Sequence, residues 1–229
     1  MKITIEGVDY DLPTSLSDIT LAQRVLYDQT YGKDLRDKLA KIIEMKDSMD
    51  RELEMGEYQC DLACKSISFF GNVPLHIIQN TALHDVLIIH GECLKAIAQE
   101  QSFSDEEFMI DHEIEWNGEV WIINPPELKH TSSTTFGEFL DSKQWVKNLF
   151  DLGNERWEAL VMLCCIYLRK KGEVYNEILS EENGDRYKIM QTLPLNHALN
   201  VGFFLSGSMH TYMKTFHSSS QLENQVSLN

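Results

Sequence analysis

Hydrophobic and polar residues alternate in two short stretches of the chain, and each stretch surrounds a glycine turn. The first alternating set lies around Glu6-Gly7 and comprises Ile3, Ile5, Val8, Tyr10 and Leu12. In the second, residues 113–116 and 119–124 flank Asn117-Gly118. Alternation with a period of two, broken by a two-residue turn with glycine, is typical of a β-hairpin. The sequence therefore predicts two hairpins, which end at Pro13 and at Pro125-Pro126.

Helix starts follow each predicted hairpin at similar distances. Thr20 with Gln23, and Thr135 with Glu138, match the capping box, in which the two residues bond each other's backbone N–H groups. Farther along, Pro74 and Pro194 each open an apolar stretch, as proline does at a first helical position. These stretches predict helices over residues 76–89 and 196–205, which end near Gly91 and Gly207.

The three kinds of signal recur in the same order, with offsets of 111, 115 and 120 residues. We interpret this as a tandem duplication, and we expect an α+β fold with two similar units, each a β-hairpin followed by a mainly α-helical bundle. The alternative is that hairpins and capped helices, which are common, recur here by chance. The expected domains are residues 1–103 and 104–217, joined near residues 101–107, followed by a polar tail over residues 218–229.

The middles of the two units differ. Residues 33–55 predict one long amphipathic helix with a narrow apolar stripe, which Lys46 interrupts. The stripe comprises Leu35, Leu39, Ile42, Met49 and Leu53. It suits pairing with another helix, or packing on its own domain, which we slightly favour. In the second unit, residues 159–168 form an apolar run of ten residues, about half of what a membrane-spanning helix needs, so we expect a core helix.

Composition and charge restrict the class of protein. The 229 residues are 43% hydrophobic and 24% charged, which is ordinary for a globular chain. Twenty basic residues against 36 acidic ones give a net charge of −16, which disfavours binding to nucleic acid phosphates. The beginning of the sequence lacks a secretory signal pattern. Five cysteines, an odd number, fit reduced thiols in a cytosol.

Cysteine and histidine residues of the first unit offer a candidate metal site. Cys60 and Cys64 would share a helix face, and His76, His84 and His90 follow them. Their spacing does not match a compact zinc site, in which the two histidines lie three to five residues apart. The pair also lacks the CxxC spacing of a redox dithiol. We favour two small core cysteines over either chemistry.

Acidic residues cluster in the second predicted hairpin at Asp111, Glu113, Glu115 and Glu119. Three of them alternate in register and would share a strand face, where carboxylates could bind a cation or act as acid and base. A solvated face is the interpretation that we favour.

Other polar and aromatic groups receive structural interpretations. His197 and His210 could face one another across the last helix, but we favour a polar pair at a helix surface. The basic residues of 168–172 would complement the dipole at the end of the apolar helix. Trp116 and Trp121 could pair across the hairpin. We favour a core position for Trp121 and make no choice between core and surface for Trp116. We assign no catalytic, cofactor-binding or metal-binding residue.

Several stretches resemble a known family. Ile3 to Pro13 and Ile19 to Gln23 resemble the opening of tailed-bacteriophage proteins of the tail-assembly-chaperone type. The later stretches that resemble the same group, and virion proteins of crAss-like phages, are Thr135 to Leu140, Leu163 to Gly172, Arg186 to Leu195 and Val201 to Phe204. This group has no catalytic residues to transfer, and the duplication and the long charged helix depart from its pattern.

The resemblance implies a non-enzymatic bacteriophage structural or assembly protein that acts by protein–protein contacts. We expect a ring-forming homo-oligomer in the portal-proximal neck or tail of the virion, assembled in the host cytoplasm, with portal, neck or tail proteins as partners. Sequence-specific nucleic acid and membranes are not expected partners. One alternative is a transient tail assembly chaperone that leaves before the particle is complete. The other is a metal-dependent enzyme that uses Asp111, Glu113 and Glu115 or the Cys60/Cys64 pair.

Overall fold

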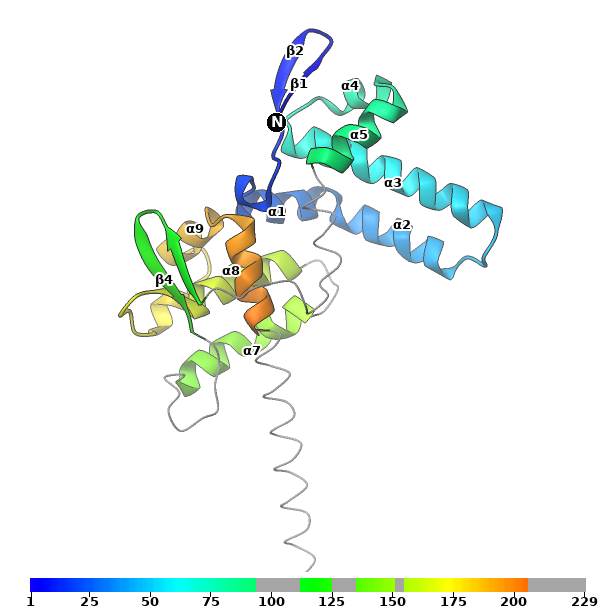
Figure 1. The fold of residues 1–229 in the computed structure, drawn as a ribbon. Coiled ribbons are helices and arrows are strands. Elements are labelled where there is room, and N and C mark those ends of the chain that lie inside the picture. Colours follow the sequence, from blue (N-terminus) through cyan, green and yellow to red (C-terminus); the bar gives the residue numbers. More distant parts are fainter. Residues whose placement is uncertain (94–111, 125–134, 151–154, 206–229) are drawn as a thin grey trace, which may run out of the picture. The chain divides into compact units, whose positions relative to one another are not determined.

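The computed structural model describes residues 1–93, 112–124, 135–150 and 155–205. The chain divides into two compact units, Met1–Glu106 and Glu107–Asn229, which are treated separately below. Each unit combines helices with a small antiparallel sheet, so the expected α+β class is confirmed (Figure 1). The boundary expected between residues 103 and 104 and the tail expected from residue 218 lie outside the described residues.

The first unit begins with the predicted hairpin. Strands β1 (Lys2–Ile5) and β2 (Val8–Asp11) pair antiparallel, with Ile3 opposite Tyr10. Both turn residues have positive φ, 52° at Glu6 and 79° at Gly7, which is the type I′ geometry that matches the twist of a hairpin. This prediction is confirmed.

One continuous helical rod follows a short 3₁₀ turn, η1 (Leu16–Asp18). It comprises α1 (Leu21–Tyr27), the π-helical turn η2 (Asp28–Gly32) and α2 (Lys33–Glu44), all joined through right-handed helical backbone. The predicted capping box at its start is confirmed. The Gln23 N–H donates to Thr20 Oγ1 at 3.2 Å, and the Thr20 N–H donates to Gln23 Oε1 at 2.8 Å.

The single helix predicted over residues 33–55 is wrong. The chain leaves the helix at Met45, which is extended, and α3 (Met49–Phe70) begins after Ser48, whose side chain accepts from the Arg51 N–H. Figure 1 shows α2 and α3 side by side as a helical hairpin. A serine or aspartate near a break satisfies the free N–H groups of a new helix, and this local gain competes with continuing the old one.

The apolar stripe of α2 packs on its own unit, as favoured above. Leu35 and Ile42 are buried in a cluster with Tyr58 of α3, and Leu39 packs against the same cluster. Met49 and Leu53, which the predicted stripe also included, are exposed on α3. The break therefore separates three core residues from two surface residues.

The helix predicted over residues 76–89 is also wrong. It consists of α4 (Leu75–Asn80) and α5 (Leu83–Cys93), and extended backbone at Thr81 separates them. The Thr81 hydroxyl donates to the Ile77 carbonyl at 2.9 Å and so satisfies the end of α4. Pro74 precedes the first helical residue as expected, but Gly91 lies inside α5 instead of ending it.

A second core cluster of the first unit joins the hairpin to α3, α4 and α5. Its buried members are Leu12, Ala63, Ile67, Val73, Ile78 and Val86. The hairpin residues Ile3, Ile5 and Tyr10 pack against it. α3 thus has two opposite covered faces, one on α2 and one on the hairpin and α4–α5.

The second unit contains the other predicted hairpin. Strands β3 (Glu113–Trp116) and β4 (Glu119–Ile123) pair antiparallel around Asn117 (φ 53°) and Gly118 (φ 74°), which confirms the type of turn. The rings of Trp116 and Trp121 lie 5.2 Å apart, and both side chains are buried. The cross-hairpin contact and the core position of Trp121 are confirmed, and Trp116 joins the core. Pro125-Pro126 lie outside the described residues.

A third strand, which the sequence analysis missed, completes this sheet. β5 (Leu168–Lys170) pairs antiparallel with β4, with Arg169 opposite Ile122. The basic cluster of residues 168–172 directly follows the end of the apolar helix at Tyr167, as expected, but it begins as a strand. Its side chains pair with carboxylates, namely Glu138, Glu119 and Glu113. Strand pairing with a segment some fifty residues away outweighs the local preference of charged residues, because β-propensity depends on context.

Helices surround the apolar run of the second unit. α7 (Phe136–Phe150) packs on α8 (Arg156–Tyr167), and η3 (Glu177–Ser180), α9 (Asp185–Gln191) and a helix over residues 195–205 follow. Every side chain from Ala159 to Leu168 is buried, so the predicted core helix is confirmed. The capping box of α7 is confirmed as well, since the Glu138 N–H donates to Thr135 Oγ1 at 3.1 Å. Gly207 lies outside the described residues.

Candidate functional site

The structure separates the cysteines and histidines of the candidate metal site. Cys60 and Cys64 lie on α3, whereas His76 lies on α4 and His84 and His90 lie on α5. Within the described ranges, three or more potential ligands nowhere gather closely enough to hold a metal ion. Cys64 packs against the core cluster of Ile67, and burial raises the pKa of its thiol. Cys64 therefore acts as a small apolar residue.

The carboxylates of the second hairpin form a solvated face with cross-strand ion pairs. Glu113 and Glu115 are exposed and alternate with buried Ile114 and Trp116 on β3. Glu113 pairs with Lys171 at 3.3 Å, and Glu119 pairs with Lys170 at 2.7 Å. Asp111 and His210 lie outside the described residues, and His197 lies on the helix over residues 195–205.

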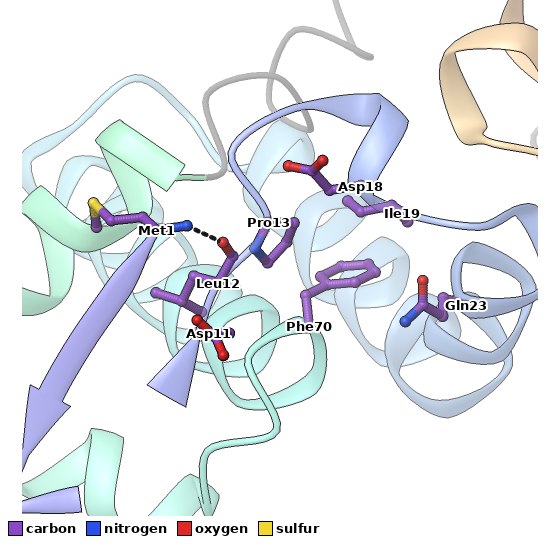
Figure 2. Close-up of a pocket in the computed structure, with 8 residues that line it drawn as sticks. All are labelled: Met1, Asp11, Leu12, Pro13, Asp18, Ile19, Gln23 and Phe70. Carbon is purple, nitrogen blue, oxygen red and sulfur yellow. Dashed lines mark hydrogen bonds between the residues drawn. The ribbon is translucent and has the colours of Figure 1, made fainter. Parts of the chain in front are cut away.

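A hollow of about 350 Å³ lies beside the first hairpin. Figure 2 shows the residues that line it: Met1, Asp11, Leu12, Pro13, Asp18, Ile19, Gln23 and Phe70. Its polar groups are largely engaged within the unit. The Met1 amino group donates to the Leu12 carbonyl at 2.6 Å, and Asp18 accepts from the Thr14 and Ser15 N–H groups.

These bonds decide what the hollow can do chemically. The N–H of Thr14, above all, holds the pKa of Asp18 below its ordinary value, so this carboxylate is ionised and oriented towards the backbone. The Gln23 amide oxygen is bonded in the capping box of α1. Phe70 and Ile19 supply apolar surface. The hollow brings together no nucleophile with a base, and it suits a structural seam or a weak contact with a small group.

Among the described residues, the most buried polar cluster lies in the second unit, and sequence reasoning missed it. Glu138 on α7 and Arg169 on β5 are 0% and 3% exposed, and their charged groups lie 3.4 Å apart. Burial, partly opposed by Arg169, raises the pKa of Glu138. Arg186 on α9 donates to the Leu168 carbonyl at 2.7 Å and to Glu173 at 2.8 Å. Two buried arginines thus tie the short strand β5 to α7 and α9.

Aromatic and hydroxyl groups extend this cluster. The Arg186 guanidinium lies 4.6 Å from the centre of the Trp121 ring, a cation–π distance. The Tyr167 hydroxyl donates to Ser142 Oγ at 2.7 Å, and Tyr175 donates to Asp141. Burial raises the pKa of each phenol to about 12, so both are protonated donors at neutral pH. The arrangement serves packing and orientation of β5.

Large apolar side chains are exposed in both units. On α5, Leu83, Leu87 and Ile88 are 57%, 43% and 49% exposed. After β5, Val174 and Ile178 are 76% and 74% exposed. Scattered apolar side chains are normal on a protein surface, but groups of them mark places where other proteins bind.

Comparison with protein-family models, with curated proteins and with solved structures yields no match for this chain. Among the helices that the structure describes, none combines the length and the apolar character needed to cross a bilayer.

Proposed function

We propose that this protein is a non-enzymatic structural or assembly protein of a tailed bacteriophage, which acts by contacts with other proteins. The observation that carries the proposal is the grouped exposure of large apolar side chains on both units, such as Leu83 and Leu87 on α5 and Val174 and Ile178 after β5. Burying such side chains in an interface is favourable by about 25 cal/mol per Å² of apolar surface. The phage setting rests on the sequence resemblance.

The proposed position is a ring in the portal-proximal neck or tail of the virion, assembled in the host cytoplasm. The proposed tandem duplication suits a ring, because two similar surfaces per chain double the number of equivalent contacts. In support, each unit begins with a type I′ hairpin and continues into a helix that starts with a capping box, at Thr20 and at Thr135. The third strand β5 belongs to the second unit's sheet, whereas the first unit's sheet has two strands.

Charge supports the proposed kind of partner. A net charge of −16 repels packaged DNA and leaves apolar and hydrogen-bonded contacts to join the subunits. Portal, neck and tail proteins are the proposed partners.

Mass spectrometry of purified particles tests the proposal. We expect this chain among the particle proteins at a constant copy number. Light scattering of the purified chain should show a closed oligomer. A monomer that is abundant in producing cells but absent from finished particles would contradict the structural role and favour a transient assembly chaperone. A chain found neither in finished particles nor in producing cells would contradict both the structural role and the chaperone role.

A further inference from the structure

Within the part of the chain that the structure describes, one face of α3 is covered over only part of its length. Apolar and small residues recur along this helix with spacings of four and three, the pattern of a helix-packing seam. This α3 stripe comprises Met49, Leu53, Gly56, Cys60, Ala63 and Ile67. Each residue advances by about 100° around a helix, so all six lie on one face.

The two ends of the α3 stripe differ sharply in exposure. Ala63 and Ile67 are fully buried under the hairpin and α4–α5 core. Met49 and Leu53 are 68% and 61% exposed, and a Cβ added to Gly56 would meet no atom of the described structure within 4 Å. The uncovered part runs from Met49 to Cys60, about 16 Å at 1.5 Å per residue, or three helical turns.

The opposite face of α3 packs on α2. The α2–α3 helical hairpin therefore holds the stripe in a fixed position. Tyr58 packs on α2, and Lys38 pairs with Asp61 at 2.7 Å. The pair of Lys65 with Asp34 at 2.6 Å joins α2 to α3 a second time. Lys65 also pairs with Asp61 of α3 itself at 2.8 Å. A preformed surface lowers the entropic cost of binding.

Carboxylates border the uncovered part. By the same helical rotation, Asp50 and Glu57 lie along one edge and Glu52 along the other, and all three are exposed. Between Met49 and Cys60, four carboxylates against one arginine leave a net charge of −3. That arginine, Arg51, points away from the stripe and pairs with Asp47.

We propose that the uncovered part of the α3 stripe binds an amphipathic helix of a partner protein, with an apolar face about three turns long and lysines or arginines along its edges. The partner helix would continue the layer that α4 and α5 form over the same face. Apolar contact supplies affinity, and opposite charges at the edges fix its register and orientation. This inference rests on the proposed function, because it names a contact through which the protein would assemble.

Charge selects this occupant over a second copy of the chain and over residues 94–111. Two α3 stripes facing each other would bring their carboxylate edges together. Residues 94–111 carry one lysine against five carboxylates, so their sequence offers no complementary charge. The occupant that fits is therefore a basic helix from another protein.

A titration with defined peptides tests the proposal on the full chain. The probe is a synthetic amphipathic peptide of about 18 residues, with a leucine face flanked by lysines, and its counterpart has glutamates instead of lysines. We expect saturable binding of the lysine peptide, none of the glutamate peptide, and loss of affinity in high salt.

Matched variants locate the binding. Met49→Gln/Leu53→Gln should weaken binding at least about tenfold, whereas Leu26→Gln/Ile43→Gln, a similarly exposed pair on α1 and α2, should change it less than about twofold. Gly56→Gln adds a side chain in open space and should also weaken binding without loss of thermal stability.

Equal binding by the wild type and the Met49→Gln/Leu53→Gln variant would overturn the proposal, as would binding of the glutamate peptide. A change of oligomeric state in that variant would overturn it too, by assigning the stripe to a second copy. If the peptide does not bind the stripe but the chain is present in purified particles, the α3 contact alone is refuted. Stripe binding by a chain absent from particles would refute the structural role alone.

Discussion

Gly32 and Gly56 both lie in helical backbone, yet replacing each with alanine should change stability in opposite directions. Alanine favours a helix over glycine by about 0.5–1 kcal/mol, because it restricts the unfolded chain. A Cβ at Gly56 would have no described atom within 4 Å, so Gly56→Ala should raise the free energy of unfolding by the full amount of about 0.5–1 kcal/mol. At Gly32 a Cβ would overlap the Asp28 carboxyl, with Asp28 Cγ at 2.6 Å and Arg36 Nη1 at 2.9 Å.

The cost at Gly32 follows from the contacts that must move. Asp28 is 5% exposed and accepts a charge-assisted hydrogen bond from Arg36 at 2.7 Å. Such a bond contributes about 1.5–3 kcal/mol, so after the helical gain Gly32→Ala should lower the free energy of unfolding by about 0.5–2.5 kcal/mol. In a unit of this size, each kcal/mol shifts the melting temperature by about 4–8 °C.

Thermal unfolding of the two variants, with circular dichroism as the readout, measures the difference. We expect Gly56→Ala to melt above the wild type and Gly32→Ala to melt below it. In an Asp28→Ala background the obstacle is absent, so Gly32→Ala should become stabilising, and this double-mutant cycle is the control. Equal upward shifts for both single variants would refute the conclusion that Asp28 closes the space beside Gly32.

Four further experiments test other contacts and one turn. Arg169→Met leaves Glu138 buried without its cation and should cost about 3–5 kcal/mol in urea denaturation, whereas adding Glu138→Leu should restore most of the loss; an equally unstable double variant would contradict this. Burial raises the pKa of Glu138 above its ordinary 4.5, so the folded state favours its protonated form. The contribution of Glu138 to the free energy of unfolding is therefore present at low pH and is lost as the pH rises through the raised pKa. The stability of the wild type relative to Glu138→Gln should thus fall as the pH rises above about 4.5, and a constant difference would refute it. Gly118→Ala forces a side chain into φ +74° and should cost about 1–2 kcal/mol by thermal melting, with no shift expected if the turn geometry were wrong. Tyr27→Phe removes a buried hydroxyl bonded to Ser66 at 2.9 Å and should cost about 1–2 kcal/mol in denaturant, while an unchanged midpoint would show that the bond contributes nothing.

Local signals predicted the local features of this fold. Glycine after Glu6 and after Asn117 identified both turns, because few other residues adopt positive φ at low cost. Thr20 and Thr135 identified two helix starts for an equally local reason, since a capping box involves four consecutive residues.

Helix ends and long-range contacts escaped prediction. The break before Ser48 had a visible signal, a capping residue followed by acidic Asp50 and Glu52, but an apolar stripe that continued across it argued for one helix. Strand β5 and the Arg169–Glu138 pair had no local signal. Each depends on residues brought together from β4 and α7, and a single sequence does not show which distant segments meet.

Long-range contacts also limited what the sequence could show about the proposed binding surface on α3 and about the acidic face of β3. Charge spacing along α3 could be read from the sequence, but exposure of Met49 and Leu53 could not, because they continued a stripe whose other members are buried. The sequence also could not show that Glu113 on β3 pairs with Lys171 across the sheet.

The π-helical turn in the first unit constrains how the length of this chain can vary. A π turn holds one residue more than an α turn, so deleting any single residue from 28–32 would restore uniform α-helical bonding between Leu21 and Glu44. That deletion would leave α2 in nearly its present orientation, with Leu35 and Ile42 still on Tyr58, because the wider π turn takes up the extra residue within one turn. A deletion within the regular helix of α2 would instead rotate the residues after it by about 100°. The π turn is therefore the place in the rod where the chain can lose one residue while α2 keeps its packing on α3.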